Sequence, residues 1–123
     1  MITIRDDKTD DDEYRMKTMD SVDQIKQRLK PIFSKEPIDK AILFGSYAQG
    51  TNTATSDVDI VIDSKGRLIG LDFFRILDEI VQALDADVDL FEAAEIVAGS
   101  PLESKIANDG IILYERKSLN QYE

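Results

Sequence analysis

The chain has 123 residues, a formal net charge of −10, and neither cysteine nor histidine. This length suits one compact domain with a single core. The composition excludes thiol nucleophiles, disulfides, imidazole bases and the usual zinc sites, and the acidic balance argues against binding a nucleic-acid backbone as the main task. Carboxylates, hydroxyls and a bound metal are left to carry any chemistry.

Both ends of the chain are polar. Residues 1–19 include an acidic run, and we expect them to lie outside the core; residues 117–123 predict a polar tail. No apolar run approaches the length needed to cross a bilayer, and the charged start lacks the apolar core of a signal peptide. We therefore expect a cytoplasmic protein with one domain over residues 20–116.

The first predicted elements are a helix and a buried strand. Ser21 and Gln24 have capping-box spacing, apolar residues then recur with helical period, and the helix should end before Pro37. The apolar run over residues 38–44 predicts a buried strand, because Gly45 ends it abruptly as a tight turn does. Ser46 would then sit at a strand end, where backbone N–H groups are free.

Residues 57–63 alternate in polarity and predict a second strand. Asp57 and Asp59 lie on the same face, because side chains in a strand point to opposite faces with period two. Two such carboxylates repel by roughly 4 kcal/mol at an effective dielectric of about 20, so a cation between them is favoured. Mg²⁺ typically takes one or two carboxylates and fills its other positions with water and substrate phosphate. The pair beside the Gly45-Ser46 turn predicts a site for Mg²⁺ and a nucleotide.

The alternative interpretation of the pair is a solvated strand edge. The same Asp-x-Asp spacing occurs at Asp10 and Asp12 and twice within residues 85–89 of this acid-rich chain. What favours the metal site is the conjunction of an apolar strand, a Gly-Ser turn, a short linker and a second strand that carries the pair.

The rest of the chain predicts a helix over residues 71–84 with a broad apolar face, and a third strand over residues 85–91. This strand brings another carboxylate to the acidic face. Ser100 and Glu103 predict the capped start of a last helix, which ends at Gly110.

A short final strand follows the last helix over residues 111–114. The order of helix, strand, strand, helix, strand, helix and strand predicts an α/β (α+β) fold, in which helices pack on a small mixed sheet.

Three motifs resemble the minimal nucleotidyltransferase (MNT) domains of the polymerase beta-type nucleotidyltransferase superfamily. They are Gly45-Ser46-Tyr47-Ala48-Gln49-Gly50, Ser56-Asp57-Val58-Asp59-Ile60 and Val88-Asp89-Leu90. The resemblance runs from Ile38 to Tyr114 and implies the nucleotidyltransferase fold.

The resemblance also implies a role for each matching residue. Gly45 and Ser46 would hold the triphosphate of ATP, and Asp57 and Asp59 would bind two Mg²⁺ ions. Asp89 would be the third carboxylate, which helps to bind metal and to activate the acceptor hydroxyl. Asp87 is the rival for that position because it lies on the same face. The implied reaction is in-line attack by the hydroxyl on the α-phosphate, with pyrophosphate leaving.

One position departs from the family, which usually has Arg where this chain has Gln49. We place Gln49 among the nucleotide-binding residues, although an amide donates a hydrogen bond without neutralising charge. Either another basic residue such as Lys65 or Arg67 substitutes, or activity is reduced. An exposed turn is the other interpretation of those two residues.

Stand-alone MNT proteins of this size resemble the antitoxin half of HEPN/MNT toxin-antitoxin pairs, in which AMP from ATP is transferred onto a tyrosine of the HEPN ribonuclease. The acidic balance suits a basic partner, encoded nearby. Two alternatives stay open: an antitoxin that acts by binding alone, and an enzyme that modifies a small molecule.

Overall fold

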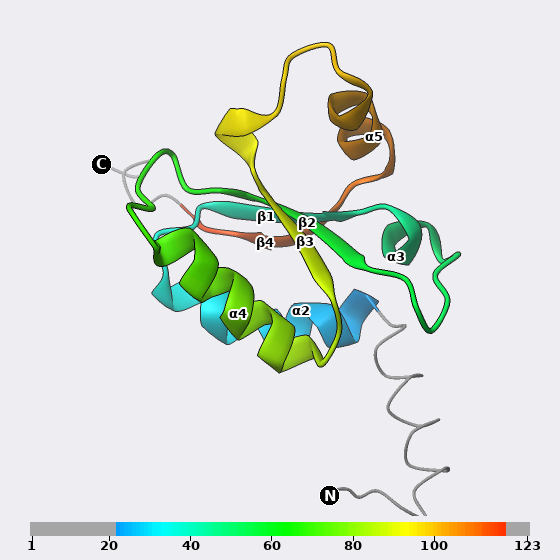
Figure 1. Ribbon diagram of the computed structural model, residues 1–123, viewed down its shortest axis with the longest axis horizontal. Helices are drawn as coiled ribbons and strands as arrows, with labels where there is room; N and C mark the ends of the chain where they lie inside the picture. The colour runs from blue at the N-terminus through cyan, green and yellow to red at the C-terminus, as the bar shows by residue number, and fades with distance from the viewer. Residues whose placement is uncertain (1–21, 118–123) are drawn as a thin grey trace, which may run out of the picture.

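The computed structural model describes residues 22–117 and shows a four-stranded sheet with helices on both faces (Figure 1). The acidic segment expected at residues 1–19, the cap expected at Ser21, and residues 118–123 of the expected tail lie outside the described residues. The elements in chain order are α2 (Val22–Lys35), β1 (Lys40–Phe44), α3 (Ser46–Gln49), β2 (Val58–Asp63), α4 (Asp72–Leu84), β3 (Val88–Glu92), the 3-10 helix η1 (Ala93–Glu95), α5 (Pro101–Asp109) and β4 (Ile111–Glu115).

The sheet is mixed, as predicted, with the strand order β3-β2-β1-β4. Strand β1 pairs antiparallel with both β2 and β4, whereas β2 and β3 run parallel and are joined through α4. A parallel pair needs such a crossover connection, which a helix commonly supplies. The predicted α/β class with helices packed on a small sheet is therefore confirmed.

The core lies between one face of the sheet and the helices α2 and α4 (Figure 1). These helices present apolar residues one turn apart, as their periodicity predicts. The fully buried side chains of this layer are Ile25, Leu29 and Phe33 from α2, Ile76, Ile80 and Leu84 from α4, and Ala41, Leu43, Val58, Ile60 and Ile62 from the two central strands.

The opposite face of the sheet is covered by η1 and α5 (Figure 1). Helix α5 has no buried residue, and a cavity of about 350 Å³ lies between its residues Ile106 and Ala107 and the sheet residues Ile42 and Val61. This face also carries Asp59 of β2 and Asp89 of β3, so it is the face on which chemistry is accessible.

The start of α5 forms as predicted. The Ser100 hydroxyl accepts a hydrogen bond from the Glu103 N–H at 3.2 Å. The Glu103 carboxylate in turn accepts from the N–H of Gly99, at 2.7 Å, rather than from that of Ser100.

None of the helices over residues 22–117 is long and apolar enough to cross a membrane.

Strand β3 begins later than the alternation over residues 85–91 predicted. Asp85 has a left-handed backbone, with φ of 54°, and its N–H donates to the Val81 carbonyl at 2.8 Å, so it closes α4. Asp tolerates this conformation better than most residues do. Asp87 precedes the strand, and its carbonyl accepts from the Val58 N–H at 2.9 Å. Asp85 therefore closes α4 instead of starting a strand, and β3 begins only at Val88.

Candidate active site

Two carboxylates face one another across the parallel strands β2 and β3. Asp59 and Asp89 are register partners, and they point to the face that α5 covers. Asp59 is half-buried and Asp89 is exposed. Asp57 lies just before β2, two residues from Asp59, and is exposed. The three predicted carboxylates thus gather at one end of β2.

The electrostatics of this cluster act most strongly on Asp59. Burial is the largest cause that raises the pKa of its carboxyl, and the negative charge of Asp89 is the next. Asp57 raises this pKa further, whereas the charge of Lys105 lowers it. The ionised pair is therefore held at a cost, which a bound cation would remove.

The donor set suits a hard cation without forming a complete cage. Within residues 22–117, no group of three acidic side chains converges closely enough to hold a metal ion by itself. Mg²⁺ takes one or two carboxylates and completes its shell with water and phosphate oxygens. The facing pair Asp59 and Asp89, with Asp57 beside it, provides such oxygen donors.

Asp89, rather than its rival Asp87, stands opposite Asp59. Asp87 lies before the strand and is exposed, and the charges that act on Asp59 include those of Asp89 and Asp57. The register of the parallel pair is what separates the two candidates, since both positions lie on the same face by alternation.

Gly45 brings the end of β1 against Asp59. Phe44 is the register partner of Asp59, and Gly45 follows it with φ of 77°. A Cβ atom at this position would lie 2.2 Å from Oδ2 of Asp59. Only glycine combines this backbone with so close an approach. The predicted turn after Gly45 is a single helical turn, α3, which begins at the half-buried Ser46.

Gln49 links α3 to α5. Its side-chain Nε2 donates to Oδ2 of Asp109 at 2.8 Å, which joins the ends of two helices 60 residues apart in sequence. The amide that stands where the family usually has Arg is thus bonded within the protein.

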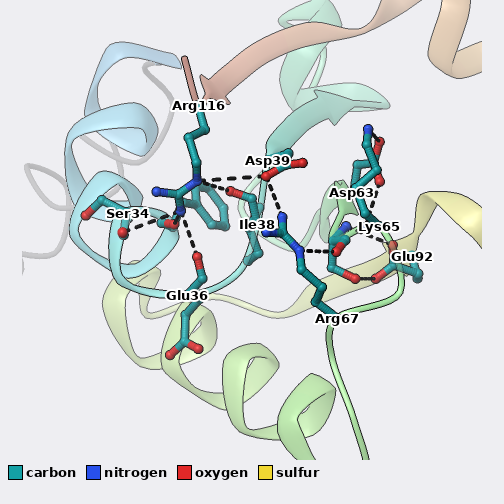
Figure 2. Close-up of polar contacts among 11 residues, drawn as sticks. Ser34, Glu36, Ile38, Asp39, Asp63, Lys65, Arg67, Glu92 and Arg116 are labelled. Atoms are coloured by element: carbon teal, nitrogen blue, oxygen red, sulfur yellow. Dashed lines mark hydrogen bonds and ion pairs between the residues drawn. The ribbon is translucent and has the colours of Figure 1, made fainter. Parts of the chain in front are cut away.

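Lys65 and Arg67 lie close to Asp63, the last residue of β2 (Figure 2). Asp57 and Asp59 are at the other end of this strand. Lys65 Nζ is 3.0 Å from Oδ2 of Asp63. Arg67 pairs with Asp39 and donates from Nε to the Ser64 carbonyl at 2.9 Å. Neither basic residue replaces the missing arginine at the carboxylate cluster, which agrees with the exposed-turn interpretation.

Lys105 of α5 is the basic residue that sequence reasoning missed. Its charge acts on Asp59. It also lies one helical turn before Asp109, on the same side of the helix, and the bond from Gln49 directs that side toward α3. The spacing of Lys105 and Asp109 was visible in the sequence, but the position of α5 above the acidic face was not.

Comparison with known proteins decides the class. Residues 27–119 match the family described as Polymerase beta, Nucleotidyltransferase. The chain belongs to this family. A protein of Methanocaldococcus jannaschii, named as a candidate protein adenylyltransferase, is 30% identical over 92 residues, which cover 74% of this chain and 96% of that protein. The predicted nucleotidyltransferase class is therefore confirmed.

Solved structures confirm the fold. A toxin-antitoxin structure with AMP-PNP aligns with a TM-score of 0.64 at 23% identity, over 79% of this chain and 78% of that one. The complex of a tri-AMPylated HEPN toxin with an MNT antitoxin, from Shewanella oneidensis, aligns with a TM-score of 0.60 at 18% identity, over 83% and 79% of the two chains.

Proposed function

We propose that this protein is a cytoplasmic antitoxin that transfers AMP from ATP onto a tyrosine hydroxyl of a partner HEPN ribonuclease, with Mg²⁺ as the required metal. The observation that carries the proposal is the facing pair Asp59 and Asp89 against Gly45, in a chain of the nucleotidyltransferase family. The name of the Methanocaldococcus relative and the composition of the similar complexes support a protein as acceptor.

In this proposal each site residue has a separate task. Gly45 and Ser46 hold the triphosphate, and Asp57, Asp59 and Asp89 would hold two Mg²⁺ ions. Bound metal would supply neutralisation of the negative charge that develops during transfer. A bond forms between the tyrosine oxygen and the α-phosphorus, the bond from that phosphorus to the bridging oxygen breaks, and pyrophosphate leaves. Asp89 accepts the proton of the tyrosine hydroxyl.

Lys105 supplies the positive charge that Gln49 lacks. An ammonium group above the carboxylates stabilises the triphosphate and the leaving pyrophosphate, because the negative charge of the nucleotide would otherwise meet three acidic side chains. Gln49 then acts through Asp109 by holding α5 in place. In this assignment the glutamine at position 49 and the lysine at position 105 are linked, because the cation near the triphosphate comes from α5 instead of α3.

The test uses the protein with Mg²⁺ and the HEPN protein encoded beside it. ATP labelled on the α-phosphate should transfer its label to that protein, whereas ATP labelled on the γ-phosphate should not, because pyrophosphate leaves. Replacing the acceptor tyrosine by phenylalanine should remove the label. These three measurements separate AMP transfer from phosphorylation and from tight nucleotide binding.

A purely binding antitoxin is the second candidate, and the bonded Gln49 is the observation that favours it. It predicts no transfer of either label, together with a tight complex that still blocks the ribonuclease. That result would contradict the enzymatic proposal.

A further inference from the structure

An exposed apolar surface lies at the open edge of the sheet. Ile69, Leu71 and Phe74 are 75%, 78% and 61% exposed. They adjoin a groove of about 520 Å³ to which Gly70 and Phe74 contribute. Its other apolar lining residues are Leu68, Phe73, Leu90, Phe91, Ile96 and Leu102. We call this surface, with Ile69 and Leu71, the edge groove.

The edge groove wraps around strand β3. Leu90 and Phe91 are neighbours in the strand and point to opposite faces of the sheet, yet both line the groove. Residues of α4 form one wall, and Ile96 and Leu102 form the other. Among the described residues, β3 pairs with β2 alone and has no strand on its outer side. Exposed apolar side chains that gather at an open sheet edge indicate a surface that another protein covers.

The edge groove lies next to the carboxylate cluster along strand β3. Phe91 and Asp89 lie on the same face of β3, two residues apart, which corresponds to about 7 Å along the strand. A protein seated in the groove therefore has surface within a side-chain length of the site. This is where an enzyme without an acceptor domain needs its acceptor to stand.

The charges of the groove select the occupant. Within residues 22–117, the charged residues in its lining are Glu92 and Glu95, and no basic residue of that range lines it. Glu92 accepts hydrogen bonds from Ser64, which leaves Glu95 to face a partner. The chain as a whole has a net charge of −10. An apolar floor with an acidic wall suits a row of apolar side chains flanked by lysine or arginine.

We propose that the edge groove docks the basic HEPN partner and thereby presents its tyrosine to Asp89. The inference rests on the proposed function for the identity of the partner. It assigns the recognition surface to residues outside the nucleotide site, so binding and transfer are separable.

The experiment measures the affinity of the full chain for the purified HEPN protein without ATP. The variant Leu71→Asp/Phe74→Asp should weaken the complex by at least about 30-fold, since buried apolar anchors dominate interfaces. The matched control is Ile112→Asp, which changes a side chain that is 45% exposed on β4, at the other edge of the sheet, and should change affinity by less than about 3-fold. Glu95→Lys should weaken the complex in low salt more than in high salt.

Equal affinity of the wild-type chain and the double variant would overturn the docking surface. So would a wild-type chain that forms dimers which the double variant dissociates, because the occupant would then be a second copy. Docking with no AMP transfer overturns the proposed function and leaves the edge groove standing as the docking surface. Wild-type transfer kinetics in the double variant overturn the inference and leave the function standing.

Discussion

The two ends of strand β2 both carry acidic residues, but they differ in how those charges are partnered. At the end with Asp63, charges are paired: Lys65 bonds Asp63, Arg67 bonds Asp39, and the Ser64 N–H and hydroxyl donate to Glu92 at 3.1 and 2.9 Å (Figure 2). At the other end Asp59 faces Asp89, and burial and the neighbouring charge raise its pKa.

The paired end holds the fold together. Arg116 donates to the carbonyls of Phe33, Glu36 and Ile38, at 3.0, 2.7 and 3.2 Å, and so caps the end of α2 (Figure 2). Such interactions satisfy groups that would otherwise be unbonded at a helix end. The unpaired end does the reverse, because it concentrates negative charge that a bound metal would neutralise. The contrast separates paired carboxylates from those of the candidate site in a chain rich in acidic residues.

The largest effect should follow from replacing the site carboxylates. Asp57→Ala and Asp59→Ala should each reduce AMP transfer by at least about 1,000-fold, since each removes a ligand that the transition state requires. The free energy of unfolding should stay constant or rise, because each change removes a repulsion that acts on or from Asp59. Transfer assays and urea unfolding check this, and retained transfer in both variants would refute the site.

Gly45→Ala should disrupt the same end of β2, through a clash with Asp59 and through backbone strain at position 45. The new Cβ would displace the Asp59 carboxylate, and φ of 77° strains alanine. We expect transfer to be lost and the free energy of unfolding to fall by about 2–3 kcal/mol. The matched control is Gly66→Ala, with φ of 76° and no atom within 4 Å of its Cβ, which should cost about 1 kcal/mol and keep transfer. Equal effects would show that the approach to Asp59 is irrelevant.

Lys105→Ala should raise KM for ATP by about 10-fold, because one positive charge near the triphosphate is lost. Affinity for AMP should change less, and Lys105→Arg should keep most of the wild-type affinity. Lys30→Ala, on the exposed side of α2, is the control. Transfer rates at varied ATP concentration give KM, and nucleotide titrations give the affinities. An unchanged KM in Lys105→Ala would remove this residue from the site.

Glu36→Gln should lower the free energy of unfolding by about 1–2 kcal/mol. Arg75 holds the buried Glu36 carboxylate with two hydrogen bonds, at 2.6 and 3.1 Å, and so lowers its pKa. Because the pKa of Glu36 is lowered, the ion pair stabilises the folded protein fully at pH values above the ordinary pKa of 4.5. This stabilisation is lost as the pH falls through the pKa of the folded state.

The difference between wild type and Glu36→Gln should therefore be full at pH 7 and shrink toward pH 3. Chemical unfolding across this range measures it, with Lys65→Ala as a control that should change stability by less than about 0.5 kcal/mol. A difference that is constant with pH would contradict the ion pair as its cause.

Much of the fold was predictable because its signals are local. The apolar run before Gly45 and the alternation after Asp57 are read from neighbouring residues, and β1 and β2 form there. Asp85 shows the limit, since its alternation with the residues after it suggested a strand while its backbone closes α4. Two local patterns competed at that position, and the helix prevailed.

The candidate site divides in the same way. Gly45 and Asp59 carry a recognisable motif, but the choice of Asp89 over Asp87 depends on the register of β3 against β2. In the sequence Lys105 is one residue of an ordinary helix, and only the position of α5 over the acidic face shows that its charge acts on Asp59. Long-range packing assigns such partners, and no spacing along the chain reports it.

The amino-acid sequence alone indicated the order of the longer helices and strands and the face on which Asp57 and Asp59 lie, because the periodicity of a strand or helix is present in its own residues. Its short motifs carried the resemblance to the family. The three-dimensional arrangement decided which groups meet: Asp59 with Asp89, Gln49 with Asp109, and the apolar walls of the edge groove around β3. These contacts join segments distant in sequence, and strand register and helix packing, which create them, are properties of the folded chain.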